Sequence, residues 1–342
     1  MKIVVCEVEE WEKDPFEVLA DDHEIGFLDK KVTKDLGKPF TDAEVLSVFI
    51  YSKLTAETLK NFKNLKLITT RSTGFDHIDI DYCRENGITV CNVPTYGCAS
   101  VAEHVFGLLL TIGHHLVDAI DRTRRGDFSL QGLTGIELRG KTLGVIGTGN
   151  IGQCVVEIAR GFQMDVLAFD VSPREDLAAK FSFRYVDMDE LLKNCEVITL
   201  HVPANKKTHH LISNSEFEKM KDGVVLINTS RGSIVDIEAL VRAISKGKVS
   251  AAGLDVLPEE PLIREEAELL RSFLQEKYDT TTLLADHILL RLRNVVITPH
   301  SAFNTKEAIQ RIMETTVDNI RAFVRGEPNN IVIHPEKHRG QK

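Results

Sequence analysis

The chain has 342 residues, of which 43% are hydrophobic and 27% charged, a composition typical of a soluble globular protein with room for two domains. Acidic residues outnumber basic ones by 51 to 42, and the formal net charge is −9, so the general basic surface that nucleic acid requires is not expected. The longest apolar stretch, residues 105–113, is too short to span a bilayer. We therefore expect neither nucleic acid nor a membrane as a partner.

The N-terminus and the cysteines both bear on the compartment in which the protein is expected. The first residues, Met1 to Glu7, become charged at once, so we expect no secretory signal there. The six cysteines include no Cys-x-x-Cys pair and no Cys/His cluster at zinc spacing. We expect reduced thiols, no metal site and a cytoplasmic protein.

Short β-rich segments alternate with helical ones from the start of the chain. The predicted strands are residues 2–8, 45–50, 65–70 and 88–93, which are compact, apolar and rich in β-branched side chains. Residues 55–62 and 78–86 are predicted helices, the second ending before Gly87. This alternation predicts βαβ units and a parallel sheet.

A Pro/Gly segment, residues 92–97, is a predicted hinge or boundary. The capping-box pattern Ser100–Glu103 then opens one predicted long helix that continues to Arg124-Arg125-Gly126. A second series of predicted strands follows: 142–146, 165–169, 197–202, 224–229, 249–254 and 294–298. Two doubly wound parallel-sheet α/β domains are the expected architecture.

A glycine fingerprint lies at the start of this second series. Gly147-Thr148-Gly149-Asn150-Ile151-Gly152 follows a predicted strand and opens a predicted helix, as in dinucleotide-binding domains. Gly147 permits the tight turn, Gly149 lets the backbone approach a pyrophosphate, and Gly152 lets helix and strand pack closely. The helix N-terminus supplies amide donors for the phosphates.

An acidic residue follows at the end of the next predicted strand. Asp170 lies 18 residues beyond Gly152, where its carboxylate could accept hydrogen bonds from the adenosine ribose and would repel a 2′-phosphate. The sequence therefore predicts NAD as the cofactor, although the nearby Arg174 leaves some use of NADP open.

Three later segments each end a predicted strand of the same domain: residues 228–232, 253–261 and 298–303. Ligands bind at the carboxyl ends of strands in open parallel sheets. Together the segments offer Arg231, one or two carboxylates and His300. An arginine can bind a carboxylate through two hydrogen bonds, and a histidine beside a carboxylate can transfer a proton near neutral pH. These groups suit hydride transfer to a carboxylate substrate.

With these motifs in place, the chain resembles the D-isomer-specific 2-hydroxyacid dehydrogenase family from about residue 1 to about 330, and within it is most similar to the D-lactate dehydrogenases. The motifs in the family's order are Arg71–Asp79, Asn92–Tyr96, Val101–His104, the glycine fingerprint, Leu200–Pro203, Thr229–Gly232, Asp255–Glu260 and Thr298–His300. The resemblance implies a Rossmann NAD-binding domain of residues 100–299, with a flavodoxin-like substrate domain of 1–99 and 300–342.

The resemblance also implies roles for individual residues. The catalytic residues would be Arg231 on the substrate carboxylate, His300 as general acid/base and Glu260 as its carboxylate partner, with Glu259 as the competing choice. Beyond the fingerprint and Asp170, the cofactor would contact His201, Val202, Pro203, Thr229, Ser230 and Asp255. The substrate would contact the Thr73 and Gly74 amides, Tyr96 and Phe303.

The implied reaction is the reversible reduction of a 2-oxo acid, with pyruvate favoured, to the D-2-hydroxy acid. The segment from Ser100 to Gly140 would form the arm of a homodimer. A glycerate or hydroxypyruvate reductase is the alternative enzyme, and an NADH-sensing corepressor of the C-terminal-binding-protein type is the alternative from another class. The long segment 261–293 leaves the size of the substrate open.

Overall fold

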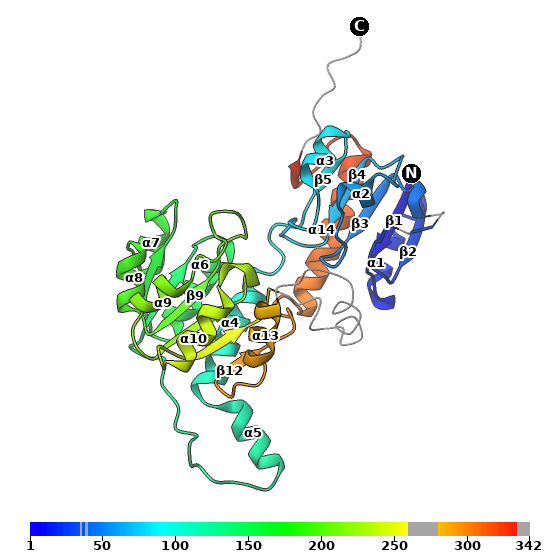
Figure 1. Cartoon of the computed structure of the whole chain (residues 1–342). Coiled ribbons are helices and arrows are strands. Elements are labelled where there is room, and N and C mark those ends of the chain that lie inside the picture. The colour runs from blue at the N-terminus through cyan, green and yellow to red at the C-terminus, as the bar shows by residue number, and fades with distance from the viewer. Residues whose placement is uncertain (35, 38–39, 259–279, 334–342) are drawn as a thin grey trace. The chain divides into compact units, whose positions relative to one another are not determined.

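The computed structural model describes residues 1–34, 36–37, 40–258 and 280–333 (Figure 1). The chain divides into two compact units, the first comprising Met1–Tyr96 and Thr305–Lys342, the second Gly97–Asn304. Among the described residues, no helix is both long and apolar enough to cross a membrane.

The first unit contains a sheet of six strands in the order β13-β5-β4-β3-β1-β2, counted over the described residues. The strands are β1 (Lys2–Cys6), β2 (Glu24–Leu28), β3 (Val45–Val48), β4 (Leu67–Thr70), β5 (Thr89–Cys91) and β13 (Ile331–Ile333). All neighbours are parallel except β13, which pairs with β5 in the antiparallel sense. The order 2-1-3-4-5 of the parallel strands is that of flavodoxin-like folds.

Helices cover this sheet and supply its core. They are α1 (Asp14–Glu17), α2 (Ala56–Leu59), α3 (Ile80–Glu85) and α14 (Lys306–Val324), with short 3-10 helices η1 (Glu10–Glu12) and η2 (Phe40–Asp42). Side chains of α2 and α3 join a core with strand residues such as Val4, Leu46 and Ile68, while α14 packs on β4 and against α1. Asp79 caps α3 by accepting a hydrogen bond from the Tyr82 amide.

Arg71 is the largest fully buried side chain of this unit and stands at the end of β4. Its guanidinium donates to the carbonyl oxygens of Cys6 (2.8 Å) and Glu7 (2.6 Å) and to Ser47 Oγ (3.1 Å). These acceptors lie on or just after β1 and on β3. One buried cation therefore ties together the carboxyl ends of three neighbouring strands.

The second unit contains a sheet of seven parallel strands, again counted over the described residues, in the order β12-β11-β10-β9-β6-β7-β8. The strands are β6 (Thr142–Ile146), β7 (Asp165–Phe169), β8 (Arg184–Tyr185), β9 (Val197–Leu200), β10 (Val224–Asn228), β11 (Val249–Leu254) and β12 (Val295–Ile297). This is the Rossmann order, in which direction of winding reverses between β6 and β9.

Alternate strand residues of this sheet face two helical layers. Val225 and Ile227 share a core with α4 (Cys98–Gly113), α6 (Asn150–Gly161) and α7 (Glu175–Phe181). Val224 and Leu226 share the other core with α8 (Met188–Asn194), α9 (Asn214–Lys219), α10 (Ile237–Ser245) and α13 (Thr280–Leu289). The two layers make this a doubly wound sheet, as predicted. The short 3-10 helix η3 (Gly232–Ile234) follows β10.

The prediction of one long helix from Ser100 is wrong. The structure has two helices, α4 and α5 (Leu116–Arg124), and α4 begins at Cys98 after Gly97, so Ser100 does not cap it. Between them His115 adopts φ +50°. The helix breaks here because the chain comes back to this point after α5, and the Ile136 amide donates to the Gly113 carbonyl (2.8 Å). That carbonyl is thus withdrawn from the helical ladder, and α5 extends away from the sheet of its unit (Figure 1).

Sequence patterns missed three strands, β2, β8 and β13, and extended others too far. The predicted strands 2–8, 45–50 and 197–202 end in the structure at Cys6, Val48 and Leu200. β2 is only half-buried, and β8 has two residues, so neither carries a clear apolar signal. The apolar residues beyond the strand ends belong to loops at the carboxyl edges of the sheets.

Replacing Arg71 by Met tests the role of this buried cation. The Arg71→Met variant should unfold with a free energy lower by about 2–4 kcal/mol, because two buried acceptors and one part-buried acceptor lose their donor. Urea denaturation followed by the fluorescence of Trp11, the sole tryptophan and a member of the same unit, measures the change. The control Arg84→Met removes an exposed pair with Asp81 and should change the value by less than about 0.5 kcal/mol. Equal effects of the two variants would contradict this account.

Candidate active site

The carboxyl edge of the second unit's sheet brings together the segments that the sequence singles out. β10, β11 and β12 are neighbours, and they end at Asn228, Leu254 and Ile297. The segments with Arg231, Asp255 and His300 follow directly, so they leave the sheet on the same edge. The glycine fingerprint follows β6 on this edge as well.

The fingerprint has the close contacts that its glycines require. Gly147 adopts φ +96°, and a Cβ there would lie 2.7 Å from the His201 carbonyl oxygen, at the switch between β6 and β9. A Cβ on Gly152 would lie 2.1 Å from the Gly147 carbonyl oxygen, so α6 packs tightly against the turn. Gly149 is different, because nothing lies within 4 Å of its Cβ position at the N-cap of α6. The open space above this helix N-terminus fits a pyrophosphate.

Asp170 follows β7 and reaches back to the fingerprint. Its Oδ2 accepts hydrogen bonds from the Thr148 amide (2.7 Å) and the Thr148 hydroxyl (3.0 Å), and its Oδ1 accepts from the Ser172 amide (2.9 Å). Burial acts to raise the pKa of Asp170, but these hydrogen bonds outweigh it and hold that pKa below its ordinary value. The carboxylate is therefore ionised at neutral pH and lies beside the predicted cofactor site.

The turn after β9 carries His201, Val202 and Pro203. His201 Nε2 lies 2.9 Å from Thr199 Oγ1, and burial lowers the pKa of this imidazole to about 3. His201 is therefore neutral at physiological pH. Its backbone carbonyl and the Val202 side chain border Gly147, which places this turn against the fingerprint.

The loop after β10 positions Arg231. The Asn228 side-chain amide donates to the Arg231 carbonyl (3.0 Å), and Asn228 Oδ1 accepts from the Ser230 amide and hydroxyl. A Cβ on Gly232 would lie 2.2 Å from the Leu257 carbonyl carbon, so this loop packs on the chain that follows β11. Arg231 Nη1 donates to the Ser230 carbonyl (2.8 Å).

Thr229 offers an observation that fits a bound cofactor. Its side chain is buried, and among the described residues Oγ1 has no hydrogen-bond partner. Buried hydroxyls are almost always paired in folded proteins. A ligand group that completes this bond would explain why Thr229 Oγ1 lacks a partner.

Asp255 holds the loop that carries His300. Its buried carboxylate accepts hydrogen bonds from Thr298 Oγ1 (2.5 Å), the Ser301 amide (2.9 Å) and the Ala302 amide (2.9 Å). The His300 amide donates to the Asp255 carbonyl (2.9 Å), and His300 adopts φ +53°. The left-handed conformation is unusual for a residue with a side chain and is fixed here by the bonds on both sides.

His104 belongs to the same network, although it is not among the predicted site residues. Its Nε2 lies 3.0 Å from Thr298 Oγ1 and 3.5 Å from Asp255 Oδ1, so helix α4 contacts the loop of His300. The only signal in the sequence was its place in the Val101–His104 motif.

The residues predicted to contact the substrate are divided between the two units. Thr73 and Gly74 belong to the first unit, where Asn92 Nδ2 donates to the Thr73 carbonyl (2.8 Å). Within the described residues, neither the Thr73 amide nor the Gly74 amide donates a hydrogen bond to a backbone carbonyl. The Tyr96 carbonyl accepts from Arg311 in that unit (2.8 Å), whereas Phe303 packs against Gly97 in the second unit. Glu260 and Glu259 lie outside the described residues.

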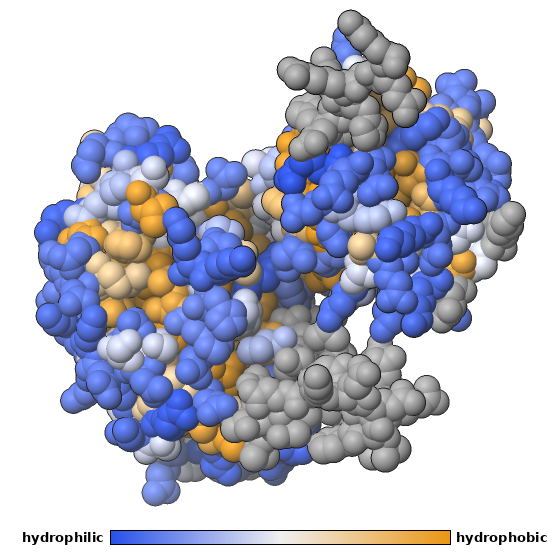
Figure 2. All heavy atoms as spheres, turned by 45° about the horizontal axis from the view of Figure 1, so that its top comes forward, coloured by the Kyte–Doolittle hydropathy of each residue, from blue (hydrophilic) through white to orange (hydrophobic). Residues whose placement is uncertain are grey.

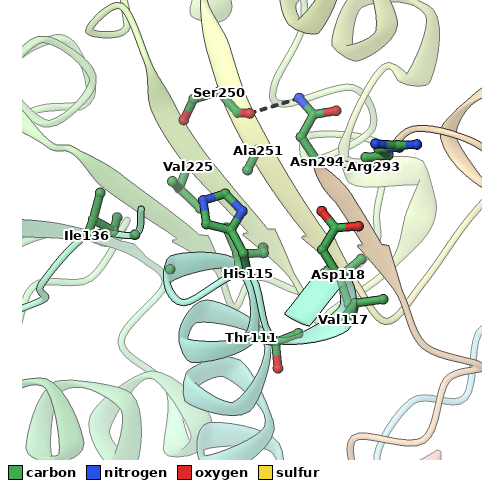
Figure 3. Close-up of a pocket in the computed structure, with 14 residues that line it drawn as sticks. Thr111, His115, Val117, Asp118, Ile136, Val225, Ser250, Ala251, Arg293 and Asn294 are labelled. Carbon is green, nitrogen blue, oxygen red and sulfur yellow. Dashed lines mark hydrogen bonds between the residues drawn. The ribbon is translucent and has the colours of Figure 1, made fainter. Parts of the chain in front are cut away.

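A pocket in the second unit opens at the other edge of the sheet. Its volume is about 220 Å³. Val225, Ser250 and Asn294 line it from the amino ends of β10, β11 and β12, and His115 and Asp118 line it from the start of α5 (Figure 3). It is therefore separate from the carboxyl edge that carries Arg231 and His300.

Two alanine variants of the fingerprint separate cofactor binding from folding. Gly149→Ala should leave the melting temperature unchanged, because its Cβ has open space, yet weaken NADH binding by about tenfold or more, since the methyl occupies the approach to the phosphates. Gly152→Ala should lower both the melting temperature and the affinity, because its Cβ collides with the Gly147 carbonyl. Thermal melts and fluorescence titration with NADH measure both. Unchanged NADH binding by Gly149→Ala would show that the cofactor binds elsewhere.

Comparison with known proteins shows the family of the chain. Residues 106–302 match the family model described as D-isomer specific 2-hydroxyacid dehydrogenase, NAD binding domain. The match contains the whole sheet of the second unit. An NAD-binding domain is thus shown for the unit that carries the fingerprint.

Relatives match over nearly the full chain. D-lactate dehydrogenase of Escherichia coli (strain K12) is 34% identical over 97% of this chain and 100% of its own. Hydroxypyruvate reductase of Thermotoga maritima is 38% identical over 90% of this chain and 94% of its own. The crystal structure of D-lactate dehydrogenase from Aquifex aeolicus, complexed with NAD and lactic acid, has a TM-score of 0.87 and 41% identity and covers 98% of this chain and 100% of its own. The chain belongs to the D-isomer specific 2-hydroxyacid dehydrogenases, a family of NAD-dependent oxidoreductases.

Proposed function

We propose that this protein reversibly reduces a small 2-oxo acid to the D-2-hydroxy acid, with pyruvate and D-lactate as the favoured pair. The observation that carries the proposal is the carboxyl edge of the second unit's sheet, where the segments of Arg231, Asp255 and His300 follow β10, β11 and β12 and the glycine fingerprint follows β6 on the same edge. NADH, when bound, supplies the hydride. The chain itself must bind the substrate's carboxylate and supply a proton.

In this proposal His300 is the general acid that protonates the carbonyl oxygen and the general base in the reverse direction. The Asp255 network fixes its loop, which meets the need of acid–base catalysis for a positioned side chain. Glu260 is the proposed carboxylate partner of His300. Arg231 binds the substrate carboxylate, for which its guanidinium geometry is suited.

The cofactor contacts are proposed from the same edge of the sheet. Asp170 accepts from the adenosine ribose hydroxyls, and its charge disfavours a 2′-phosphate. The residues proposed to line the remainder of the cofactor are Thr148, Asn150, Ile151, His201, Val202, Pro203, Thr229, Ser230 and Asp255. Asp255 already accepts three hydrogen bonds, so its main contribution is to the loop of His300.

The substrate contacts are proposed partly from the first unit. The Thr73 and Gly74 amides donate to no backbone carbonyl among the described residues, so they can donate to an anion. This supports the proposal that the loop binds the substrate carboxylate. Tyr96 and Phe303 are proposed to limit the size of the substrate. Similarity to D-lactate dehydrogenases supports pyruvate as the proposed substrate, whereas similarity to hydroxypyruvate and glyoxylate reductases supports the alternative substrate class.

Turnover on a panel of acids identifies the substrate. NADH oxidation by the purified protein is measured with pyruvate, hydroxypyruvate, glyoxylate and a bulkier 2-oxo acid. We expect the highest kcat/KM with pyruvate. A higher value with hydroxypyruvate would assign the alternative reductase function. Tight NADH binding without turnover on any acid would favour the sensor of the C-terminal-binding-protein type.

Two substitutions distinguish the proton donor from the carboxylate ligand. His300→Gln should lower kcat by about 10²–10⁴-fold with little change in the affinity for NADH. Arg231→Gln should raise KM for the 2-oxo acid and lower kcat together, because it removes binding in both ground and transition states. Steady-state kinetics with a His23→Gln control measure these changes. Full turnover by His300→Gln would refute the acid–base assignment.

We also propose a homodimer and a cytoplasmic location. Phe128 and Leu130, in the segment after α5, are 77% and 82% exposed, and Val117 and Ile120 on α5 are exposed as well. Apolar side chains gathered on one projecting element are typical of an interface. Most of the face in Figure 2 is hydrophilic, as a soluble protein requires. All six cysteines are free thiols, which suits a reducing compartment.

Charges placed on the projecting segment test the dimer. The double variant Phe128→Asp/Leu130→Asp should shift the molar mass measured by light scattering from dimer to monomer, because two carboxylates would be buried in the interface. Val171→Asp, at another strongly exposed apolar position, serves as the control and should leave the mass unchanged. A wild-type protein that is monomeric at micromolar concentration would exclude the proposal.

A further inference from the structure

A tyrosine outside the predicted site is hydrogen-bonded to the fingerprint. The Tyr185 phenol oxygen lies 2.8 Å from Thr148 Oγ1, and Thr148 Oγ1 lies 3.0 Å from Asp170 Oδ2. Three residues from three segments thus form one chain of hydrogen bonds. Thr148 is buried, whereas Asp170 and Tyr185 are half-buried.

The chemistry of the three groups fixes the direction of the chain. Asp170 is ionised and can only accept, so the Thr148 hydroxyl donates its one proton to the carboxylate. The Thr148 oxygen must then accept from the Tyr185 hydroxyl. A donor that polarises the Thr148 hydroxyl strengthens the bond to the carboxylate, because linked hydrogen bonds support one another.

The chain of bonds orients Asp170 for a ligand. Oδ2 receives both bonds from Thr148, and Oδ1 receives the bond from the Ser172 amide, against about four acceptor positions in a carboxylate. The plane of the carboxylate is therefore fixed, and its charge is retained. To recognise a ribose hydroxyl, a carboxylate must be held in place and must have an acceptor position left.

We propose that Tyr185 is a positioning residue for cofactor selection, which through the Thr148 hydroxyl holds Asp170 in place to bind the adenosine ribose of NAD(H) in preference to NADP(H). The proposal rests on the ribose contact proposed above for Asp170. Tyr185 touches neither the reacting atoms nor, in this proposal, the cofactor. It acts through Thr148.

The position of Tyr185 makes a conservative test possible. Tyr185 belongs to β8, which pairs with β7, and its ring packs edge-to-face on Phe183 with the centroids 5.0 Å apart. Tyr185→Phe keeps these packing contacts and removes only the hydroxyl. Thr148→Val likewise keeps the shape and the backbone amide, whereas Thr148→Ser keeps the hydroxyl.

The test is a set of fluorescence titrations of the intact protein with three cofactors: NADH, NADPH and the NADH analogue that lacks the adenosine 2′-hydroxyl. We expect Thr148→Val to raise the Kd for NADH by about tenfold, because it removes the hydroxyl that donates to the Asp170 carboxylate. Tyr185→Phe should raise it by about three- to tenfold, because it removes the donor to that hydroxyl. Thr148→Ser should retain the wild-type Kd. For NADPH and the 2′-deoxy analogue, Tyr185→Phe should change Kd by less than about twofold, and kcat at saturating NADH should be unchanged.

The comparison separates positioning from a structural role. If Tyr185→Phe weakened NADH and the 2′-deoxy analogue equally, Tyr185 would only support the fold, and the proposal would be overturned. An unchanged Kd for NADH would overturn it as well. Asp170→Asn tests the proposed ribose contact itself. If this variant keeps wild-type affinity and the preference for NADH, the ribose contact fails together with the role of Tyr185. If Asp170→Asn loses them and Tyr185→Phe does not, only the inference about Tyr185 fails.

Discussion

A single buried carboxylate, that of Asp255, organises the edge of the sheet on which the proposed chemistry depends. It accepts from the Thr298 hydroxyl and from the amides of Ser301 and Ala302, so the residues on both sides of His300 are bonded to it. A buried charge without such partners would be costly, whereas here its cost is offset by three donors. The same bonds keep His300 in a left-handed conformation that it would rarely adopt otherwise. Stability and orientation of the loop thus come from one interaction.

Close backbone approaches complete this edge. Gly147 lies against the turn of His201, Gly152 against Gly147, and Gly232 against the chain at Leu257. In each place a side chain would collide with backbone atoms, so the loops after β6, β9, β10 and β11 can assemble only with glycine at these positions. Hydrogen bonds hold two further residues of these loops: Asp170 accepts from the Thr148 amide, and the Arg231 carbonyl accepts from the Asn228 side chain.

Much of this arrangement follows from the sequence, because the strands of the second unit are short apolar segments whose ends are marked by polar residues and glycine. The parallel sheet, the fingerprint and the segments of Arg231, Asp255 and His300 could be predicted in this way. The break between α4 and α5 could not, since it depends on the Ile136 amide, which arrives from 23 residues beyond Gly113 to take its carbonyl. The short strand β8 could not either, and with it the bond from Tyr185 to Thr148. Contacts between distant segments leave no periodic signal, and the network of His104 with Thr298 was missed for the same reason.

If the chain acts on D-2-hydroxy acids through the groups at this edge, it should distinguish the two enantiomers of its substrate. The purified protein is supplied with NAD and either D-lactate or L-lactate, and the formation of NADH is followed by absorbance. We expect NADH formation with D-lactate and a rate lower by at least about 10³-fold with L-lactate, because a fixed proton acceptor and a fixed carboxylate ligand can orient only one enantiomer toward the cofactor. Comparable rates with the two enantiomers, or oxidation of L-lactate alone, would contradict this expectation.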